Sequence, residues 1–361
     1  MKTAFASSDL SGKTIGNWKV KDVIANNDIT TQYSLFYNVE NDNGPAIMKV
    51  LDTEKCYGDK EEGISRMELL SRETTAFHYE TKVAEACASR HMSNVIRYIE
   101  SGEVDLDGYA IPMVAYIVYE LSEGKIGDFL KYSSKSDFVV DLRMLVEKLR
   151  SLHQVTKGVK QLHTNFIAHH NITPQSVEVF DSNSTFKLGA LHTSHTDQDE
   201  LQSPESGKLY NGDLTFAPPE AFFAPNKRDM GSYYQIDTYM LGNLVVYYLT
   251  QLNMTTLLNR HLPYTLKEWA KGGADYQAVL PDIINAFEKV LKNIKSCICV
   301  EELQEPIMEI ISCLCNPDPE KRGYPGTFMT ATANADLQRV LTKLDILYKR
   351  GERLLAQYNH R

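Results

Sequence analysis

The stretch from Leu162 to His192 constrains the fold more than any other part of the chain. It follows the segment from Phe138 to His163, in which apolar residues recur every 3.6 residues, and this spacing predicts a long amphipathic helix. The helix leads into a polar loop that contains His169-His170-Asn171. Two short apolar runs, VEVF and FKLG, then flank the turn-forming sequence DSNS and predict a hairpin.

The sequence before this stretch predicts a β-rich region with one helix. WKVKDVI, YSLFYNV and PAIMKVL, within residues 18–51, are rich in β-branched and aromatic residues and are separated by turn formers. A polar insertion at about 52–65 precedes a predicted helix at about 67–89, whose apolar side includes Phe77 and Val83. Two further strands are expected at 95–102 and 113–119.

Several motifs, taken in order, resemble those of the protein kinase superfamily, in particular the Hanks-type Ser/Thr kinases. Residues 46–49 (AIMK) resemble the V-A-I-K strand, and 119–124 (YELSEG) the hinge between two lobes. Residues 169–176 lie in the frame of the catalytic loop H-R-D-x-x-x-x-N, and 217–220 (APPE) are close to A-P-E. Residues 237–242 resemble the helix that supports the catalytic loop, and 316–322 the late D-P-x-x-R element.

The resemblance implies an α+β, bilobal, protein-kinase-like fold. A small β-rich N-lobe with one long helix would precede a larger, mainly helical C-lobe. The expected units are an N-terminal extension (1–17), the N-lobe (18–121), the C-lobe (122–347) and a C-terminal helical extension (348–361). The last predicted helix, at about 333–358, repeats leucines at helical spacing and becomes basic beyond Lys349.

The resemblance also implies two ion pairs. Lys49 would pair with a glutamate of the N-lobe helix, for which Glu80 is the first choice and Glu73 and Glu85 are rivals. We expect a partly exposed pair, which contributes about 1 kcal/mol or less. A second, buried and structural pair is expected from the A-P-E and D-P-x-x-R resemblances, between Glu220 and Arg322.

Two further structural roles follow from the same resemblance. Asp237 is expected to hydrogen-bond the backbone of the loop. His169 is expected to pack against the core.

The positions that would perform chemistry in a kinase carry other residues here. Asn171 stands where the catalytic aspartate would be, and an amide takes up no proton near neutral pH. Thr173 replaces the loop lysine, while Ser176 and Ala190 stand at the two metal-binding positions. The turn at 25–31, in the place of the glycine-rich phosphate lid, contains no glycine. In this respect the chain resembles a pseudokinase.

We therefore expect a catalytically inactive scaffold or allosteric regulator of a protein partner, such as an active kinase, a phosphatase or their substrate. Lys49, Glu80, Tyr119, Glu120 and Leu121 would form a vestigial nucleotide cleft, with no cofactor expected and ATP binding without Mg²⁺ left open. One alternative is an atypical Ser/Thr kinase that uses Lys49 and Glu80 with non-standard metal ligands. Another is a nucleotide-binding switch without turnover.

A metal site is not expected. His170, His192 and His195 have no carboxylate or cysteine partner at a typical ligand spacing. Asp181 lies in the predicted turn, and Asp197 and Asp199 in a polar segment. The two Cys-x-Cys pairs, Cys297/Cys299 and Cys313/Cys315, are interpreted as core packing.

Bulk properties set further limits. The net charge of −9 argues against non-specific nucleic-acid binding, which needs an excess of Lys and Arg. No signal peptide or membrane span is recognisable, so we expect a cytoplasmic protein with reduced cysteines. The polar segment from about 193 to 215, in the place of an activation segment, offers Ser194, Ser203 and Ser206 for phosphorylation by another kinase.

Overall fold

The structure is a computed structural model of the 361-residue chain. It describes residues 5–25, 31–59, 64–129, 138–196, 212–223, 229–324 and 336–359. Most of the turn predicted at 25–31 and of the segment at 193–215 therefore lies outside the described residues. The same holds for Asp197, Asp199, Ser203 and Ser206.

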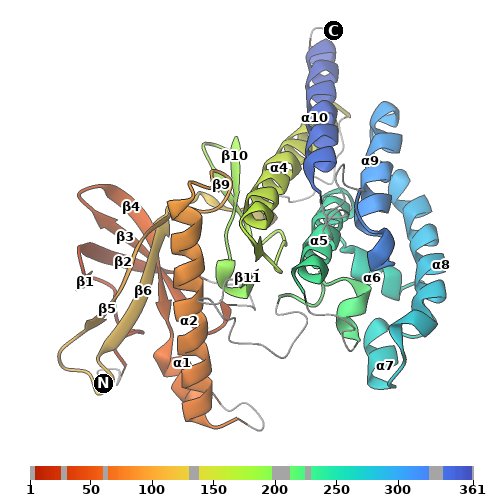
Figure 1. Cartoon of the computed structure of the whole chain (residues 1–361). Helices are drawn as coiled ribbons and strands as arrows, with labels where there is room; N and C mark the ends of the chain where they lie inside the picture. Colours follow the sequence, from red (N-terminus) through yellow and green to blue (C-terminus); the bar gives the residue numbers. More distant parts are fainter. Residues whose placement is uncertain are drawn as a thin grey trace.

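The N-terminal part is built on an antiparallel six-stranded sheet with the strand order β1-β2-β3-β4-β6-β5. Its strands are β1 (Thr14–Ile15), β2 (Trp18–Ile24), β3 (Ser34–Asn41), β4 (Gly44–Leu51), β5 (Tyr98–Asp105) and β6 (Met113–Glu120). Helix α2 (Arg66–Ser89) lies beside the sheet, as Figure 1 shows. It begins with a capping box between Ser65 and Glu68, which satisfies two backbone N–H groups at the helix start.

Two hydrophobic clusters position this sheet. On one side, Met48 and Val118 pack with Ala6 and Leu10, so residues of the predicted N-terminal extension contribute to the core of the sheet. The second cluster is larger: it includes Phe77 and Val83 of α2 and continues through the helices of the C-terminal part. One continuous apolar core therefore joins the two parts of the molecule.

The C-terminal part is mainly helical. Its helices are α3 (Ile126–Phe129), α4 (Phe138–Thr164), α5 (Met230–Thr250), α6 (Met254–Asn259), α7 (Leu266–Lys271), α8 (Tyr276–Lys295), α9 (Glu301–Leu314) and α10 (Gln338–Asn359). Small strands lie near the N-terminal part: β7 (Gly124–Lys125), β8 (Ile167–Ala168), β9 (Val177–Phe180), β10 (Thr185–Leu188) and β11 (His195–Thr196). The protein is thus α+β, with a β-rich N-terminal and a helical C-terminal part, consistent with the expected bilobal organisation.

Some expected element boundaries are wrong. The apolar pattern predicts a helix from Asp237 to about Leu252, but α5 begins at Met230, where Asp229 caps it, so Asp237 lies in its interior. The first residues of α5 are largely polar, which hides this start in the apolar pattern. The insertion at 52–65 contains a short helix, α1 (Thr53–Gly58), which Asp52 caps through its side chain.

The interpretation of both Cys-x-Cys pairs as core packing holds for only one pair. Cys315 is buried and Cys313 is partly buried, whereas Cys297 and Cys299 are exposed. Both exposed cysteines lie between the end of α8 at Lys295 and the start of α9 at Glu301, so they belong to the apolar stripe of neither helix. Among the described residues, no helix is both long enough and apolar enough to cross a membrane.

Candidate functional site

Lys49 and Glu80 form a buried ion pair between the sheet and α2. The Nζ of Lys49, on β4, lies 2.5 Å from Oε2 of Glu80, and the two side chains are 4% and 3% exposed. The hydroxyl of Tyr119, on β6, donates to the other carboxylate oxygen of Glu80 at 3.1 Å. The pair expected from the sequence is present, but the expectation of partial exposure is wrong. Loss of one partner would leave an uncompensated buried charge.

The two rival glutamates of α2 have other partners. Glu73 accepts a hydrogen bond from Nε of Arg72 at 2.9 Å. Glu85 accepts from the hydroxyl of Tyr98, on β5, at 2.9 Å. Of the three candidates, Glu80 is therefore the one that contacts the lysine of β4.

A second buried carboxylate lies where the chain leaves the sheet. Glu178, on β9, forms an ion pair with Lys125 of β7 and is 5% exposed. The hydroxyl of Ser122 donates to the other oxygen of Glu178 at 2.7 Å. Sequence reasoning missed this pair. The available signal was a glutamate inside the otherwise apolar run VEVF, at a position that pairs with Lys125 once β7 and β9 align.

The hinge-like residues Glu120 and Leu121 lie beside this pair. Lys187 of β10 donates to both carboxylate oxygens of Glu120, at 2.6 and 2.8 Å. The backbone N–H of Arg97 also donates to Glu120, at 2.7 Å. Leu121 is exposed. Glu120 therefore fixes the chain segment between the sheet and the helical part, and its carboxylate is committed to that contact.

Asp237 organises the loop that follows α4. Its two carboxylate oxygens accept hydrogen bonds from the backbone N–H groups of His169 and His170, each at 2.7 Å, and Nε2 of His163 lies 2.8 Å away. Burial alone would raise the pKa of Asp237, but the hydrogen bond from His163 and the nearby histidines lower it to about 2. The charged carboxylate thus holds the loop in place from the middle of α5.

His169 is fully buried and its hydrogen bonds define its tautomer. The backbone N–H of Asn171 donates to Nδ1 at 3.1 Å, so Nε2 carries the proton and donates to the carbonyl of Gly189 at 2.7 Å. Burial lowers the pKa of His169. The side-chain oxygen of Asn171 accepts from the backbone N–H of Asp213 at 3.4 Å. The amide of Asn171 thus faces the start of the 212–223 segment.

Thr173 and Ser176, in the same loop, form hydrogen bonds with each other. The hydroxyl of Ser176 donates to the carbonyl of Thr173 at 2.9 Å and accepts from its N–H at 3.0 Å. Both residues are buried. Ala190 has left-handed backbone geometry, with φ of 56°, directly before a short 3₁₀ turn at Leu191–Thr193. A methyl group is all that this side chain offers to a ligand.

His192 lies in the same 3₁₀ turn, is partly buried and has cationic side chains near it. Burial, followed by the charges of Lys49, His169 and Lys125, holds the pKa of His192 well below its usual value of 6.5. The ring is therefore neutral at pH 7. The two lysines near it are each paired with a glutamate, Lys49 with Glu80 and Lys125 with Glu178.

The rings of His170 and His195 form an aromatic cluster with the ring of Tyr233. Their ring centroids are 4.5 Å apart, and Tyr233 of α5 stacks on His195 at 4.6 Å. Burial lowers the pKa of His170 to about 3 and that of His195 to about 4. Within the described part of the chain, no group of three or more His, Cys, Asp and Glu side chains is placed to hold a metal ion.

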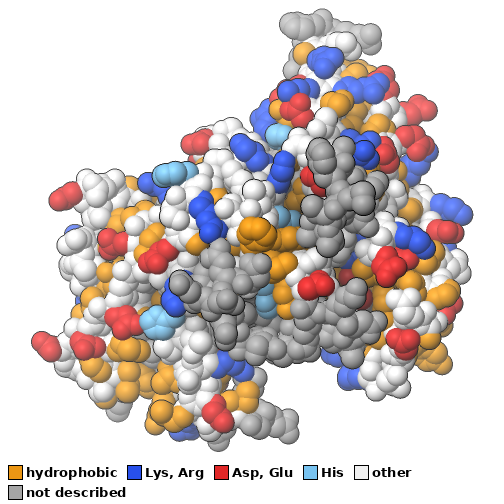
Figure 2. All heavy atoms as spheres, in the orientation of Figure 1, with side chains coloured by type: hydrophobic (Ala, Val, Ile, Leu, Met, Phe, Trp, Pro, Cys, Tyr) orange, Lys and Arg blue, Asp and Glu red, His pale blue; other side chains and the backbone are white. Residues whose placement is uncertain are grey.

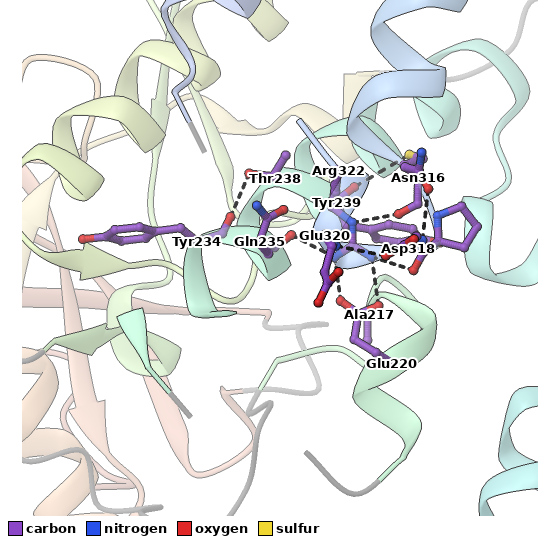
Figure 3. Close-up of polar contacts among 12 residues, drawn as sticks. Ala217, Glu220, Tyr234, Gln235, Thr238, Tyr239, Asn316, Asp318, Glu320 and Arg322 are labelled. Atoms are coloured by element: carbon purple, nitrogen blue, oxygen red, sulfur yellow. Dashed lines mark hydrogen bonds and ion pairs between the residues drawn. The ribbon is translucent and has the colours of Figure 1, made fainter. Parts of the chain in front are cut away.

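Arg322 and Glu220 form the second ion pair expected from the sequence, shown in Figure 3. The pair joins the 3₁₀ turn Pro219–Phe222 to the segment after α9. The guanidinium also donates to the carbonyls of Asn316, Gln235 and Pro317, at 2.9, 3.1 and 3.3 Å. All five N–H groups of a buried arginine therefore have acceptors.

Comparison with known proteins gives a limited match. The chain is 28% identical over 163 residues to serine/threonine-protein kinase PTK1/STK1 of Saccharomyces cerevisiae. The aligned region covers 41% of this chain and 23% of that kinase, so the chain spans less than a quarter of its relative. No protein-family model matches the chain. The comparison thus supports a distant kinase-like relationship over part of the sequence.

Proposed function

We propose that this chain is a catalytically inactive, protein-kinase-like protein that acts by binding another protein. The partner class we favour is an active kinase, a phosphatase or a substrate of either. The observation that carries the proposal is the contrast within one site: the Lys49–Glu80 pair and the loop held by Asp237 are present, while the side chain of Ala190 has no oxygen. The similarity to a yeast Ser/Thr kinase supports the kinase-like part of this reading.

Phosphoryl transfer requires metal ions that neutralise the phosphates and a group that accepts the hydroxyl proton. The two metal-binding positions carry Ser176 and Ala190, and neither residue has a carboxylate. The hydroxyl of Ser176 is also engaged in a local turn with Thr173. Asn171 cannot act as a general base near neutral pH, and loss of such a base lowers the rate by about 10²–10⁴. These losses together support a protein without useful phosphotransfer.

The Lys125–Glu178 pair adds an electrostatic argument. In the proposed kinase-like arrangement, a nucleotide would lie against the hinge segment at 119–124. The buried carboxylate of Glu178 lies directly beside this segment and bonds Ser122 within it. Lys125 is already paired with this carboxylate, so its ammonium group is not free to bind a phosphate. The site therefore favours its own internal pairs over an anionic ligand.

A second candidate is a nucleotide-binding switch that does not turn ATP over. The observation that favours it is the buried Lys49–Glu80 pair, because a lysine held in this way is positioned to contact phosphates. In this case ATP would bind without Mg²⁺, through Lys49 and the hinge residues Tyr119, Glu120 and Leu121. An atypical kinase with other metal ligands is a third, less favoured reading.

A label-transfer assay tests the proposal. The full-length protein is incubated with γ-labelled ATP and Mg²⁺ or Mn²⁺, alone and with a generic protein substrate, and incorporated label is counted. We expect no label above that of a variant with Lys49→Met and Glu80→Met. Metal-dependent label that this double variant loses would establish the atypical kinase and refute the scaffold.

The proposal includes the division of the chain and its location. We place the N-lobe at 18–121 and the C-lobe at 122–347, with extensions at either end, in a cytoplasmic protein. Affinity capture of the intact protein from its own cells, followed by identification of the bound proteins, would name the partner.

A further inference from the structure

Positive charge is concentrated on two helices that pack against each other, α4 and α10. Together they contain ten Lys and Arg and four Asp and Glu, a net charge of +6. The whole chain carries −9, so the rest of it carries −15. Figure 2 shows Lys and Arg side chains gathered over α4 and α10. We refer to α4 and α10 together as the basic sector, because their net charge is positive while that of the whole chain is negative.

A groove of about 540 Å³ runs between the two helices within this sector. Its walls include Lys157 and Lys160 on α4 and Leu341, Thr342 and Asp345 on α10. Apart from Leu341, which is buried, the residues that line it have polar side chains. We refer to it as the α4–α10 groove.

The acidic side chain of the groove is neutralised by a partner, whereas its two lysines are not. Asp345 is paired with Lys349, one turn further along α10, at 2.8 Å. Lys160 donates to the side-chain oxygen of Gln338, which carries no charge. Among the described residues, neither Lys157 nor Lys160 has an acidic partner. Two ammonium groups therefore remain to attract an anionic ligand.

An exposed aromatic side chain lies at the end of α4. Asn165 lines the groove, and Phe166 follows it with a ring that is 57% exposed and a φ of 58°. Left-handed geometry disfavours a bulky residue, and local strain of this kind occurs at contact sites. The ring adds an exposed apolar side chain directly after a residue that lines the groove.

We propose that the α4–α10 groove binds an acidic segment of a partner protein, with Lys157 and Lys160 contacting carboxylates and Phe166 covering an apolar side chain beside them. A short acidic segment needs only the local field of the two helices. An extended nucleic acid would also meet Asp345 and the strongly acidic remainder of the chain, which repel a phosphate backbone. The inference rests on the protein-partner part of the proposed function and is independent of nucleotide binding.

Fluorescence anisotropy with the intact protein tests this inference. The probe is a fluorescein-labelled polyglutamate peptide with a single leucine, and the variant is Lys157→Glu with Lys160→Glu. The matched control is Lys289→Glu with Lys292→Glu, two exposed lysines with the same spacing on α8. We expect the groove variant to weaken binding by about tenfold or more and the control to leave it unchanged, with affinity falling as salt rises.

Phe166→Asn provides a second variant that keeps the fold. Asparagine tolerates left-handed geometry, so the melting temperature should be maintained or raised while peptide binding weakens. Equal binding by the wild type and the groove variant would overturn the inference. So would equal losses in the groove variant and the α8 control, or tighter binding of single-stranded DNA of matched charge. Affinity capture with the groove variant separates this inference from the proposed function: partners that the wild type and the groove variant capture equally would support the proposed function while placing the contact outside this groove.

Discussion

Arg322 and Glu220 are 102 residues apart in the chain and meet through two hydrogen bonds, of 2.5 and 2.9 Å, between guanidinium and carboxylate. The arginine side chain is fully buried. It also lies over the ring of Tyr239 on α5, 5.0 Å from its centroid (Figure 3). The pair therefore connects three separate segments of the helical part.

Replacing Arg322 by Met should destabilise the protein strongly. Glu220 would lose its partner in a poorly hydrated site, and breaking a buried pair from one side costs about 3–5 kcal/mol. Denaturant unfolding measures the change. Lys343→Met, which removes an exposed pair with Glu309, is the control and should change stability by about 1 kcal/mol or less. Similar losses in both variants would contradict a special role for Arg322.

The Lys49–Glu80 pair should show strong coupling in a double-mutant cycle. Lys49→Met alone leaves the Glu80 carboxylate buried with only the Tyr119 hydroxyl, so we expect a loss of about 3–5 kcal/mol. Lys49→Met with Glu80→Met removes both charges and should recover much of that loss. Additive effects would mean that the two groups do not interact in solution. Any cellular test of Lys49 therefore needs the double variant.

The Lys125–Glu178 pair should behave in the same way but less strongly. Lys125 is about one third exposed, so solvent screens part of the interaction. Lys125→Met should lower the unfolding free energy by about 1–3 kcal/mol, because Glu178 keeps only Ser122. Adding Glu178→Met should restore stability. A Lys125→Met protein as stable as the wild type would show that Glu178 is hydrated.

Stability should fall as the pH drops from about 6.5 to 4. The pKa of His195 is about 4 in the folded protein, against an ordinary value of 6.5, because of burial. The unfolded chain therefore binds this proton first, and the folded state loses stability as pH falls. At about 1.4 kcal/mol per pKa unit, His195 accounts for about 3 kcal/mol at pH 4.

Urea unfolding at several pH values checks this. His195→Gln should flatten the decline, whereas His78→Gln, at an exposed histidine, should not. An unchanged slope in His195→Gln would mean that His195 is already protonated in the folded protein at pH 5 to 6.

Two long-range contacts could be expected from the sequence, because the order of the motifs specifies which segments of the chain meet. Asp237 reaching the loop backbone, and Glu220 reaching Arg322, both follow from resemblance rather than from local pattern. The Lys125–Glu178 pair could not be predicted in this way, since it depends on the register of two short strands. The sequence also indicates neither the burial of Lys49 nor the left-handed Phe166, because neither leaves a trace in apolar spacing.

The central claim is that this site no longer binds magnesium and ATP together, and a thermal-shift titration tests it most directly. The melting temperature is followed against ATP concentration with and without Mg²⁺, with Mg²⁺ alone as the control. A ligand at one hundred times its Kd stabilises the folded state by about 2.7 kcal/mol, which is readily seen. We predict no Mg²⁺-dependent increase at millimolar ATP. An increase that requires Mg²⁺ and disappears in Lys49→Met with Glu80→Met would contradict the account.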